Sequence, residues 1–227
     1  MCYFCFSKEC QGLEMSIKVK ICGITKIEDA HFLEESKADY AGFVFHPESS
    51  RHLSYEQAGL ISKELHASIK KVALAVDPDD YLTEYMIEAI APDYIQLHGA
   101  ESPERCTMLK QKFDCRIIKA LGIGSAAHLE SAKNFDSCAD FILLDALPLP
   151  DGPKGGTGHR FDWSLLTDYD GTLPWFLAGG LTPNNIREAV LATGATHVDV
   201  SSGVESQAGI KDRDKISRFI QAVRLEK

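Results

Sequence analysis

Short apolar runs rich in β-branched residues recur eight times along this chain, and helix-like patterns separate them. The runs are IKVKIC (17–22), YAGFVF (40–45), KVALAV (71–76), YIQL (94–97), RIIKAL (116–121), FILLD (141–145), WFLA (175–178) and HVDV (197–200). This alternation is typical of repeated βα units and a parallel sheet. Eight such units fit the length of a (β/α)8 barrel, whereas an open doubly wound sheet would more often have fewer strands and a G-x-G-x-x-G turn after the first one. The sequence therefore predicts a single-domain α/β fold, an eight-stranded parallel TIM barrel over residues 15–227.

The segments between the runs contain signals for helix starts and for core-facing helix sides. Capping-box spacing links Thr25 to Glu28 and Ser54 to Gln57. A hydroxyl stands before a proline at Ser102-Pro103 and at Thr182-Pro183, as at the first turn of a helix. Three stripes have the i, i+3, i+4, i+7 spacing of a buried helix side: Leu82, Tyr85, Met86 and Ala89; Ile186, Ala189, Val190 and Thr193; Ile216, Phe219, Ile220 and Val223.

The first 14 residues precede this pattern, and we expect them to be a disordered tail, because Met15 stands directly before SIKVKICGIT. Cys2, Cys5 and Cys10 form C-x2-C-x4-C in this tail. Zinc and iron–sulfur sites usually need four ligands, and no matching pair follows, so we predict neither a metal nor a cofactor. Seven cysteines in a chain without the features of a signal peptide point to a reducing compartment, so we expect a cytoplasmic protein.

Composition excludes several classes of partner. No run of about 18 apolar residues is present, which argues against a membrane span. The net charge is −9 and lysines and arginines do not cluster, which argues against a nucleic-acid surface. We expect a small-molecule ligand, which could be an anion bound locally, and a monomer or a homodimer.

Chemistry in a TIM barrel gathers at the carboxyl ends of the strands, where the loops converge on one mouth. Cys22 ends the first run and Asp145 ends the otherwise apolar sixth run. Lys20 shares a strand face with Cys22, and a buried ammonium beneath a thiol would favour the thiolate, a usable base. Partial desolvation of a carboxyl group favours its protonated form, so Asp145 is a candidate proton donor. The alternatives are a buried cysteine that acts only as a small hydrophobe and an aspartate that only caps or ties a loop.

Glycine-bearing loops follow the last three strands: GGTG (155–158), AGGL (178–181) and SSGVE (201–205). Such loops present backbone N–H groups to an anion, so we predict a phosphate site there, with turns as the alternative. Arg51 lies on the second loop, which we expect to be far around the barrel from the glycine loops. Its guanidinium could bind a carboxylate through two parallel hydrogen bonds, or it could be a surface arginine. His98 ends the fourth strand and shares a face with Gln96.

Six ordered blocks resemble the phosphoribosylanthranilate isomerase family, the cofactor-free isomerases of tryptophan biosynthesis. The blocks are KVKICGIT, AGFVFHPESSRHLS, DYIQLHGAE, FILLDALPLPDGPKGGTGHRFDW, FLAGGLTPNNI and VDVSSGVES. The resemblance runs from about residue 17 to the end of the chain. It implies an Amadori rearrangement of N-(5'-phosphoribosyl)anthranilate to 1-(2-carboxyphenylamino)-1-deoxyribulose 5-phosphate.

The resemblance also implies roles for single residues. It makes Cys22 the general base and Asp145 the general acid, and it assigns Arg51 to the anthranilate carboxylate. Substrate-binding positions that it implies further are His98, Gly156, Gly179, Gly180, Asp199, Ser202 and Gly203. Two other readings are open: an aldolase-type barrel with a Schiff base on Lys119, and a phosphosugar-binding barrel that does no catalysis.

Overall fold

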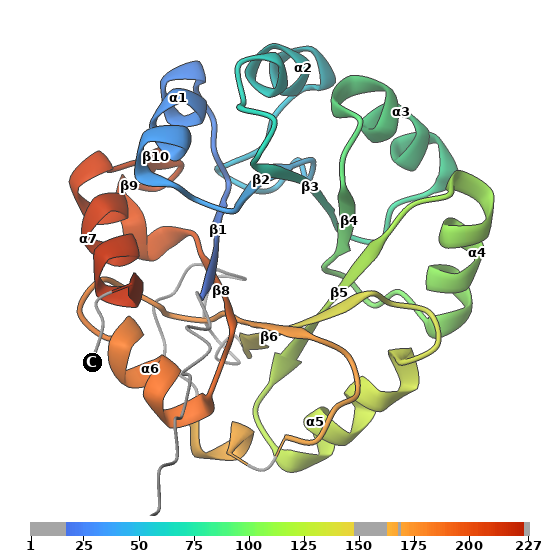
Figure 1. The fold of residues 1–227 in the computed structure, drawn as a ribbon. Helices are drawn as coiled ribbons and strands as arrows, with labels where there is room; N and C mark the ends of the chain where they lie inside the picture. Colours follow the sequence, from blue (N-terminus) through green and yellow to red (C-terminus); the bar gives the residue numbers. More distant parts are fainter. Residues whose placement is uncertain (1–16, 148–162, 168, 225–227) are drawn as a thin grey trace, which may run out of the picture.

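Eight parallel strands close into a barrel in the computed structural model, which describes residues 17–147, 163–167 and 169–224 (Figure 1). The strand order follows the sequence from β1 to β8, and β8 pairs with β1 to close the ring. This confirms the predicted TIM barrel. The strands are β1 (Lys18–Cys22), β2 (Tyr40–Val44), β3 (Lys70–Ala75), β4 (Tyr94–Leu97), β5 (Ile117–Ile123), β6 (Phe141–Ala146), β7 (Trp175–Leu177) and β8 (His197–Val200).

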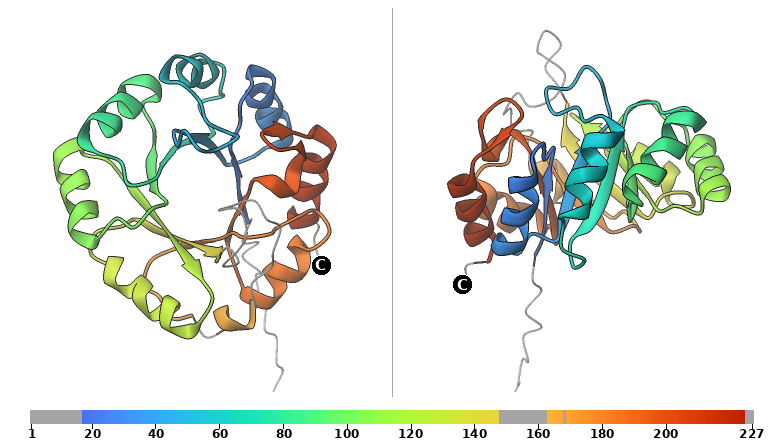
Figure 2. Two further views of the ribbon diagram at one scale, coloured as in Figure 1. Left: turned by 180° about the vertical axis from the view of Figure 1, so that it is seen from behind. Right: turned by 90° about the horizontal axis from the view of Figure 1, so that it is seen from above.

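Helices form a ring outside the strands, as the views from behind and from above show (Figure 2). They are α1 (Ile27–Ser36), α2 (Tyr55–Lys63), α3 (Asp80–Ile90), α4 (Pro103–Phe113), α5 (Ala126–Ala132), α6 (Ile186–Thr193) and α7 (Arg213–Arg224). Short 3-10 turns add η1 (Lys133–Phe135), η2 (Trp163–Leu166) and η3 (Ser202–Val204). Between β6 and β7 the described residues contain η2 in place of an α-helix. A small antiparallel hairpin, β9 (Glu205–Gln207) and β10 (Ile210–Lys211), follows η3 and was not predicted.

Two of the predicted helix starts are correct. Ser54 Oγ accepts a hydrogen bond from Gln57 N at 3.1 Å, and the Gln57 side chain accepts one from Ser54 N at 3.0 Å, which is a complete capping box. Ser102 Oγ accepts a hydrogen bond from Arg105 N at 3.3 Å, with Pro103 at the start of α4.

The other two predicted starts are wrong, because the threonine hydroxyls do not cap the helices and neighbouring side chains bind the backbone there instead. Asp29 Oδ2 accepts hydrogen bonds from Thr25 N and Lys26 N, and the Thr25 hydroxyl donates instead to Gly209 O at 2.9 Å. At the second site, Asn185 Oδ1 accepts a hydrogen bond from Thr182 N at 2.7 Å, which folds residues 182–185 into a turn and delays α6 until residue 186.

The helix side that faces the core is as predicted on α7 and rotated on α3. Ile216, Phe219, Ile220 and Val223 are all buried on α7. On α3 the predicted Tyr85 is 52% exposed and its ring lies 5.3 Å from that of Tyr55, while Thr83 takes a buried position. Thr83 is buried without an unpaired hydroxyl because its Oγ1 donates to Asp79 O at 2.8 Å.

Aromatic rings fill the end of the barrel where the strands begin. We call Tyr40, Tyr94, Phe141, Phe176 and His197 the aromatic floor. Neighbouring rings in this group have centroid separations of 5.1–6.2 Å, mostly in edge-to-face or tilted arrangements. The floor closes the end of the barrel where the strands begin, so polar chemistry is confined to the end where the strands end.

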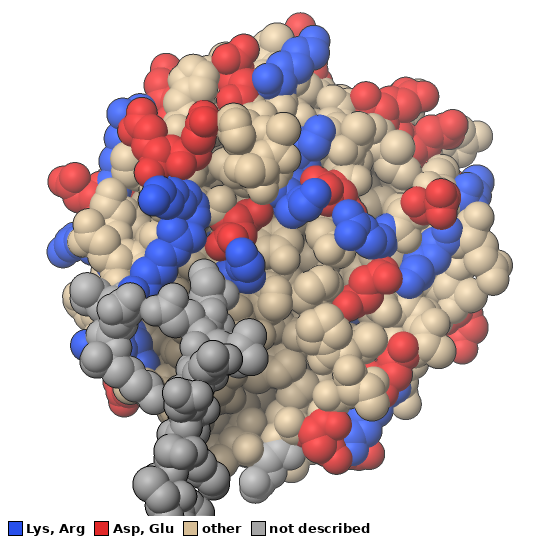
Figure 3. Space-filling model, in the orientation of Figure 1, with Lys and Arg blue, Asp and Glu red and all other residues tan. Residues whose placement is uncertain are grey.

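Charged side chains of both signs are interspersed on the face shown in Figure 3. Among the described residues, no helix has the combination of length and apolarity that crossing a bilayer requires.

Candidate active site

Cys22 is the last residue of β1 and lies at the mouth, the end of the barrel where the strands end. It is 5% exposed and packs against Val44 and Leu74. Gly42 pairs with it on β2, and a Cβ at Gly42 would lie 2.8 Å from Cys22 Sγ and 2.9 Å from Cys22 Cα. Ser201, just after β8, donates a hydrogen bond from its hydroxyl to Cys22 O at 2.9 Å. The thiol is therefore held in a tight site made by three neighbouring strands and the eighth loop.

The predicted effect of Lys20 on Cys22 is only part of the electrostatics. Burial raises the pKa of the Cys22 thiol, and this outweighs the opposing effect of the Lys20 ammonium. Lys20 is fully buried, and its Nζ donates to Asp199 Oδ1 at 2.9 Å across the β1–β8 pair. Although burial alone would lower it, the Asp199 carboxylate holds the pKa of Lys20 above its usual value. Lys20 thus favours the thiolate as predicted, but burial has the larger effect and Asp199 opposes the lysine, so the pKa of Cys22 is raised overall.

Arg51 lies across the end of β1. A Cβ at Gly23 would be 2.4 Å from Arg51 Cδ, so the arginine stem occupies the space above that glycine. Its Nε donates to Glu205 Oε1 and its Nη2 to Glu205 Oε2, both at 2.7 Å. Glu205 follows η3 in the eighth loop, so the prediction that Arg51 is far from the glycine loops is wrong for that loop. The error arises because β8 and β2 both pair with β1 in the closed barrel.

Glu205 also binds a buried lysine that the sequence analysis did not single out. Lys211 Nζ donates to Glu205 Oε1 at 2.8 Å and to Ser201 O at 3.2 Å, and the lysine side chain is 1% exposed. Although burial alone would raise it, the bonds from Arg51 and the charge of Lys211 hold the pKa of Glu205 below its usual value. Glu205 is therefore a carboxylate that fixes one edge of the Arg51 guanidinium.

Asp145 and His98 meet at the mouth. Asp145 Oδ1 accepts a hydrogen bond from Ala146 N at 2.8 Å, and Asp145 Oδ2 lies 3.5 Å from His98 Nε2. Both side chains are about one-third exposed. On its other side, His98 Nδ1 lies 3.0 Å from the Gln96 amide nitrogen, which can only donate. His98 thus lies between Gln96 and Asp145, with one ring nitrogen near each.

The two candidate catalytic groups lie at the same end of one barrel. Cys22 ends β1 and Asp145 is the penultimate residue of β6, three strands away through β8 and β7. They face a common mouth, and the aromatic floor closes the opposite end of the barrel. A base and an acid so placed can move protons on one bound molecule.

Lys119, the alternative Schiff-base residue, is already paired. Its Nζ donates to Glu101 Oε2 at 2.7 Å and to Gly99 O at 2.8 Å, and the side chain is 2% exposed. A lysine held as a buried ammonium is not a free amine nucleophile. The structure gives no support to the aldolase reading.

The seventh and eighth loops lie against each other near the mouth. Gly179 and Gly180 follow β7, and Gly203 within η3 packs against the carbonyl of Leu181. Ser202 begins η3. The structure thus brings together Gly179, Gly180, Ser202 and Gly203 from two loops, while Gly156 lies outside the described residues.

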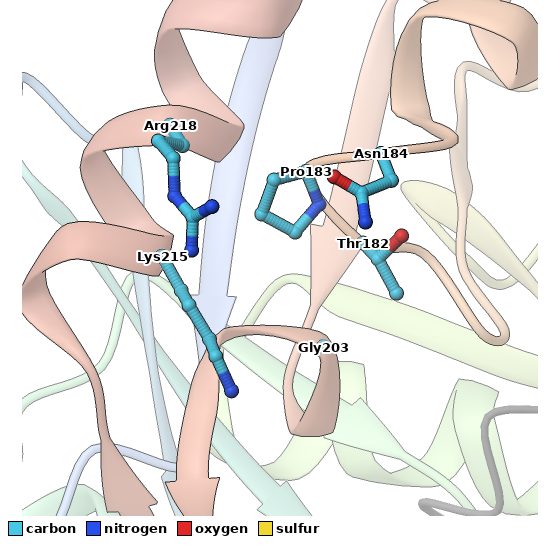
Figure 4. Close-up of a pocket in the computed structure, with 6 residues that line it drawn as sticks. All are labelled: Thr182, Pro183, Asn184, Gly203, Lys215 and Arg218. Atoms are coloured by element: carbon cyan, nitrogen blue, oxygen red, sulfur yellow. The ribbon is translucent and has the colours of Figure 1, made fainter.

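A pocket of about 210 Å³ lies between these loops and α7 (Figure 4). Thr182, Pro183 and Asn184 line one wall, Lys215 and Arg218 of α7 line the other, and Gly203 lies at its edge. None of Cys22, Asp145, Arg51 and His98 borders it. The pocket therefore contains neither candidate catalytic residue, but it shares Gly203 with the predicted substrate-binding positions.

Comparisons with known proteins support the fold and show the family. A family model described as N-(5'phosphoribosyl)anthranilate (PRA) isomerase matches residues 19–222. The chain is 44% identical to the N-(5'-phosphoribosyl)anthranilate isomerase of Paramagnetospirillum magneticum, over 92% of this chain and 98% of that protein.

Solved structures of the same enzyme superimpose on the barrel. The phosphoribosylanthranilate isomerase of Thermotoga maritima matches with a TM-score of 0.83 and 39% identity, over 92% of this chain and 98% of that one. A second matching structure, with a TM-score of 0.81 and 38% identity, covers the same shares and is a complex with reduced 1-(o-carboxyphenylamino)-1-deoxyribulose 5-phosphate. The chain belongs to the phosphoribosylanthranilate isomerase family.

Proposed function

We propose that this chain isomerises N-(5'-phosphoribosyl)anthranilate to 1-(2-carboxyphenylamino)-1-deoxyribulose 5-phosphate, with Cys22 as general base and Asp145 as general acid. The observation that carries the assignment of roles is the placement of this thiol and this carboxyl at the ends of β1 and β6 around one mouth. The activity itself is that of the family, and its acid–base chemistry requires no cofactor.

Asp145 starts the reaction by giving a proton to the furanose ring oxygen. The C1'–O bond then breaks, and the aryl nitrogen supplies the electrons that form an iminium. Asp145 Oδ2 is the oxygen suited to this, because Oδ1 already accepts the hydrogen bond from Ala146 N. His98 lies 3.5 Å from Oδ2 and stabilises the carboxylate that remains after proton transfer.

Cys22 completes the rearrangement by removing the proton from C2' of the iminium. The electrons of the broken C2'–H bond form a C1'=C2' double bond, and the π electrons of the iminium return to nitrogen. The enolamine that results tautomerises to the ketone of the product. The base must be a thiolate at this step. Since burial raises the pKa of Cys22, the charges around the thiol decide how much thiolate is present.

Two ends of the substrate are held by different parts of the mouth. Arg51 is fixed by Glu205 through Nε and one N–H of Nη2, and its other N–H groups bind the anthranilate carboxylate. Backbone groups at Gly179, Gly180, Ser202 and Gly203 bind the phosphate, as glycine-bearing loops do in many barrels. Asp199 uses its Oδ1 for Lys20, and its second oxygen accepts a hydrogen bond from a sugar hydroxyl. The role of Gly156 stays a prediction.

The test of the function is direct. Purified protein given freshly prepared N-(5'-phosphoribosyl)anthranilate should cause a loss of the anthranilate-type fluorescence with saturation kinetics, and the product should have the mass of the substrate. An aldolase would instead be trapped on Lys119 by borohydride in the presence of substrate. A protein that binds the substrate but leaves the fluorescence unchanged would contradict the proposal and favour the non-catalytic barrel.

Replacing Gly42 by alanine should lower kcat/KM by on the order of a hundredfold, which is what a displacement of about 1 Å can cost. The added methyl group would lie within 3 Å of both Sγ and Cα of Cys22, so the catalytic residue must shift. The matched control is Gly59→Ala on α2, where the Cβ would meet only Ala89 O at 3.2 Å and no active-site atom. Steady-state kinetics and thermal melting of both variants would separate the local displacement from a general loss of stability. Equal kinetics for Gly42→Ala and wild type would show that the site tolerates the shift.

We further propose a cytoplasmic location, which the four described free thiols, Cys22, Cys106, Cys115 and Cys138, support. A monomer and a homodimer both stay predictions. One matching Thermotoga maritima structure is described as a monomer generated from a dimeric isomerase, which concerns that protein.

A further inference from the structure

Five charged side chains surround the end of β1 near Cys22, and they come from five parts of the chain. Lys20 is on β1, Arg51 follows β2, Asp199 is on β8, Glu205 is on β9 and Lys211 is on β10. The remaining strands packed against the thiol, β2 and β3, contribute Gly42, Val44 and Leu74, which do not titrate. With three cations and two carboxylates, this group has one positive charge in excess.

The hydrogen bonds show which cation supplies the excess. Lys20 bonds to Asp199 at 2.9 Å, and the two bonds of 2.7 Å between Arg51 and Glu205 form a complete bidentate pair. Lys211 shares only Glu205 Oε1, which already accepts from Arg51 Nε. Its other partners are the backbone oxygen and hydroxyl of Ser201, the residue that bonds to Cys22 O.

We propose that Lys211 is a positioning residue of the reaction: with Glu205 it sets the net charge beside Cys22 and thereby controls how readily that thiol becomes a base. The proposal rests on the role of Cys22 given under the proposed function. Lys211 does not touch the substrate, since its side chain is 1% exposed. Burial lowers the pKa of Lys211, and the Glu205 carboxylate, 2.8 Å from its Nζ, opposes that fall. The ammonium paired in this way acts through its electric field, which bulk water and salt screen only weakly at such a site.

The direction of the effect follows from the environment of the thiol. Burial raises the pKa of Cys22, and both Lys20 and Lys211 oppose that rise. Because Lys20 is opposed by Asp199 and Arg51 is paired with Glu205, loss of Lys211 removes the excess positive charge of the group and one of the two lysines that oppose the rise. Loss of the negative charge on Glu205 raises the net positive charge of the group from one to two. The two changes must therefore move the titration of Cys22 in opposite directions.

The test is the pH dependence of kcat/KM, whose acid limb reports the base in the free enzyme. Lys211→Met should move that limb to higher pH by about one unit or more, and Glu205→Gln should move it to lower pH by a similar amount. The double variant Glu205→Gln/Lys211→Met keeps one cation in excess, Arg51, so its limb should return close to that of the wild type. Lys211→Arg keeps the positive charge, so the acid limb of its kcat/KM profile should lie at the same pH as in the wild type.

A second readout does not depend on turnover. The rate at which iodoacetamide alkylates Cys22, followed by mass spectrometry of the peptide over a range of pH, reports the thiolate directly. Half-buried Cys115 in the same samples is the internal reference. The alkylation profiles should shift in the same opposite directions as the kinetic limbs.

Several outcomes would decide the matter. Identical alkylation profiles in all variants, or shifts of both single variants in the same direction, would overturn the proposal, because general loosening of the site moves both alike. Opposite shifts in a protein without isomerase turnover would retain the charge-setting pair and reject the proposed function. If Lys211→Met fails to fold, as judged by circular dichroism, Glu205→Gln and Lys211→Arg still test the proposal: the first should shift the alkylation profile to lower pH, and the second should leave it in place.

Discussion

Replacing Cys22 by serine should lower kcat by on the order of a hundredfold or more, the usual cost of losing a positioned base. Serine is close in size to cysteine, so the contacts with Val44 and Leu74 and the space left by Gly42 are kept. A serine hydroxyl is a far weaker acid than a thiol, and burial would disfavour its anion still more. The variant can therefore bind the substrate and open its ring, but it has no base for the proton on C2'.

The control for this variant is Cys115→Ser. This residue lies between the end of α4 and the start of β5, at the end of the barrel opposite the mouth, and its replacement should leave kcat near the wild-type value. Binding can be measured apart from chemistry by calorimetry with reduced 1-(o-carboxyphenylamino)-1-deoxyribulose 5-phosphate, the ligand in the homologous complex. Affinity for this ligand should change little. Full activity of Cys22→Ser would remove the thiol from the mechanism and leave the base unassigned.

Replacing Asp145 by asparagine should also lower kcat by on the order of a hundredfold or more. The amide oxygen can still accept the hydrogen bond from Ala146 N, so the local backbone should be unchanged. The amide cannot deliver a proton to the ring oxygen, and it can no longer draw stabilisation from His98 as a carboxylate does. Ring opening becomes the slow step in this variant, whereas proton removal from C2' is the slow step in Cys22→Ser.

Asp140→Asn is the matched control, because Asp140 stands just before the same strand at its other end, where it bonds to Ile117 N and Lys110. It should lower stability without a comparable loss of kcat. Thermal melting and steady-state kinetics on both variants make the comparison. An Asp145→Asn enzyme that turns over at the rate of Asp140→Asn would assign the acid to another group at the mouth.

The sequence was sufficient to predict the strands and the ends that carry chemistry. Eight apolar runs each became one strand, with boundaries that differ by at most about two residues, because buried parallel strands are short and apolar and have few competing interpretations. The strand-end rule then selected Cys22 and Asp145, since position along a strand fixes which end of the barrel a side chain occupies.

Pairings between loops could not be predicted in the same way. Glu205 and Lys211 lie on a hairpin beyond the eighth strand, where no strand-end rule applies, and their partners Arg51 and Ser201 are fixed only by closure of the barrel. The helix starts at Thr25 and Thr182 were wrong for a related reason. Several polar side chains compete for the same backbone N–H groups there, and the outcome depends on contacts that sequence spacing does not specify.

The aromatic floor determines how the substrate can enter and the product can leave. The packed rings of the aromatic floor close one end of the barrel, so the site is open only at the mouth. A substrate molecule that enters through the mouth cannot displace the product through the opposite end of the barrel. The product must therefore leave before the next substrate molecule binds. Because accumulated product binds to the same site as the substrate, it should inhibit the enzyme competitively.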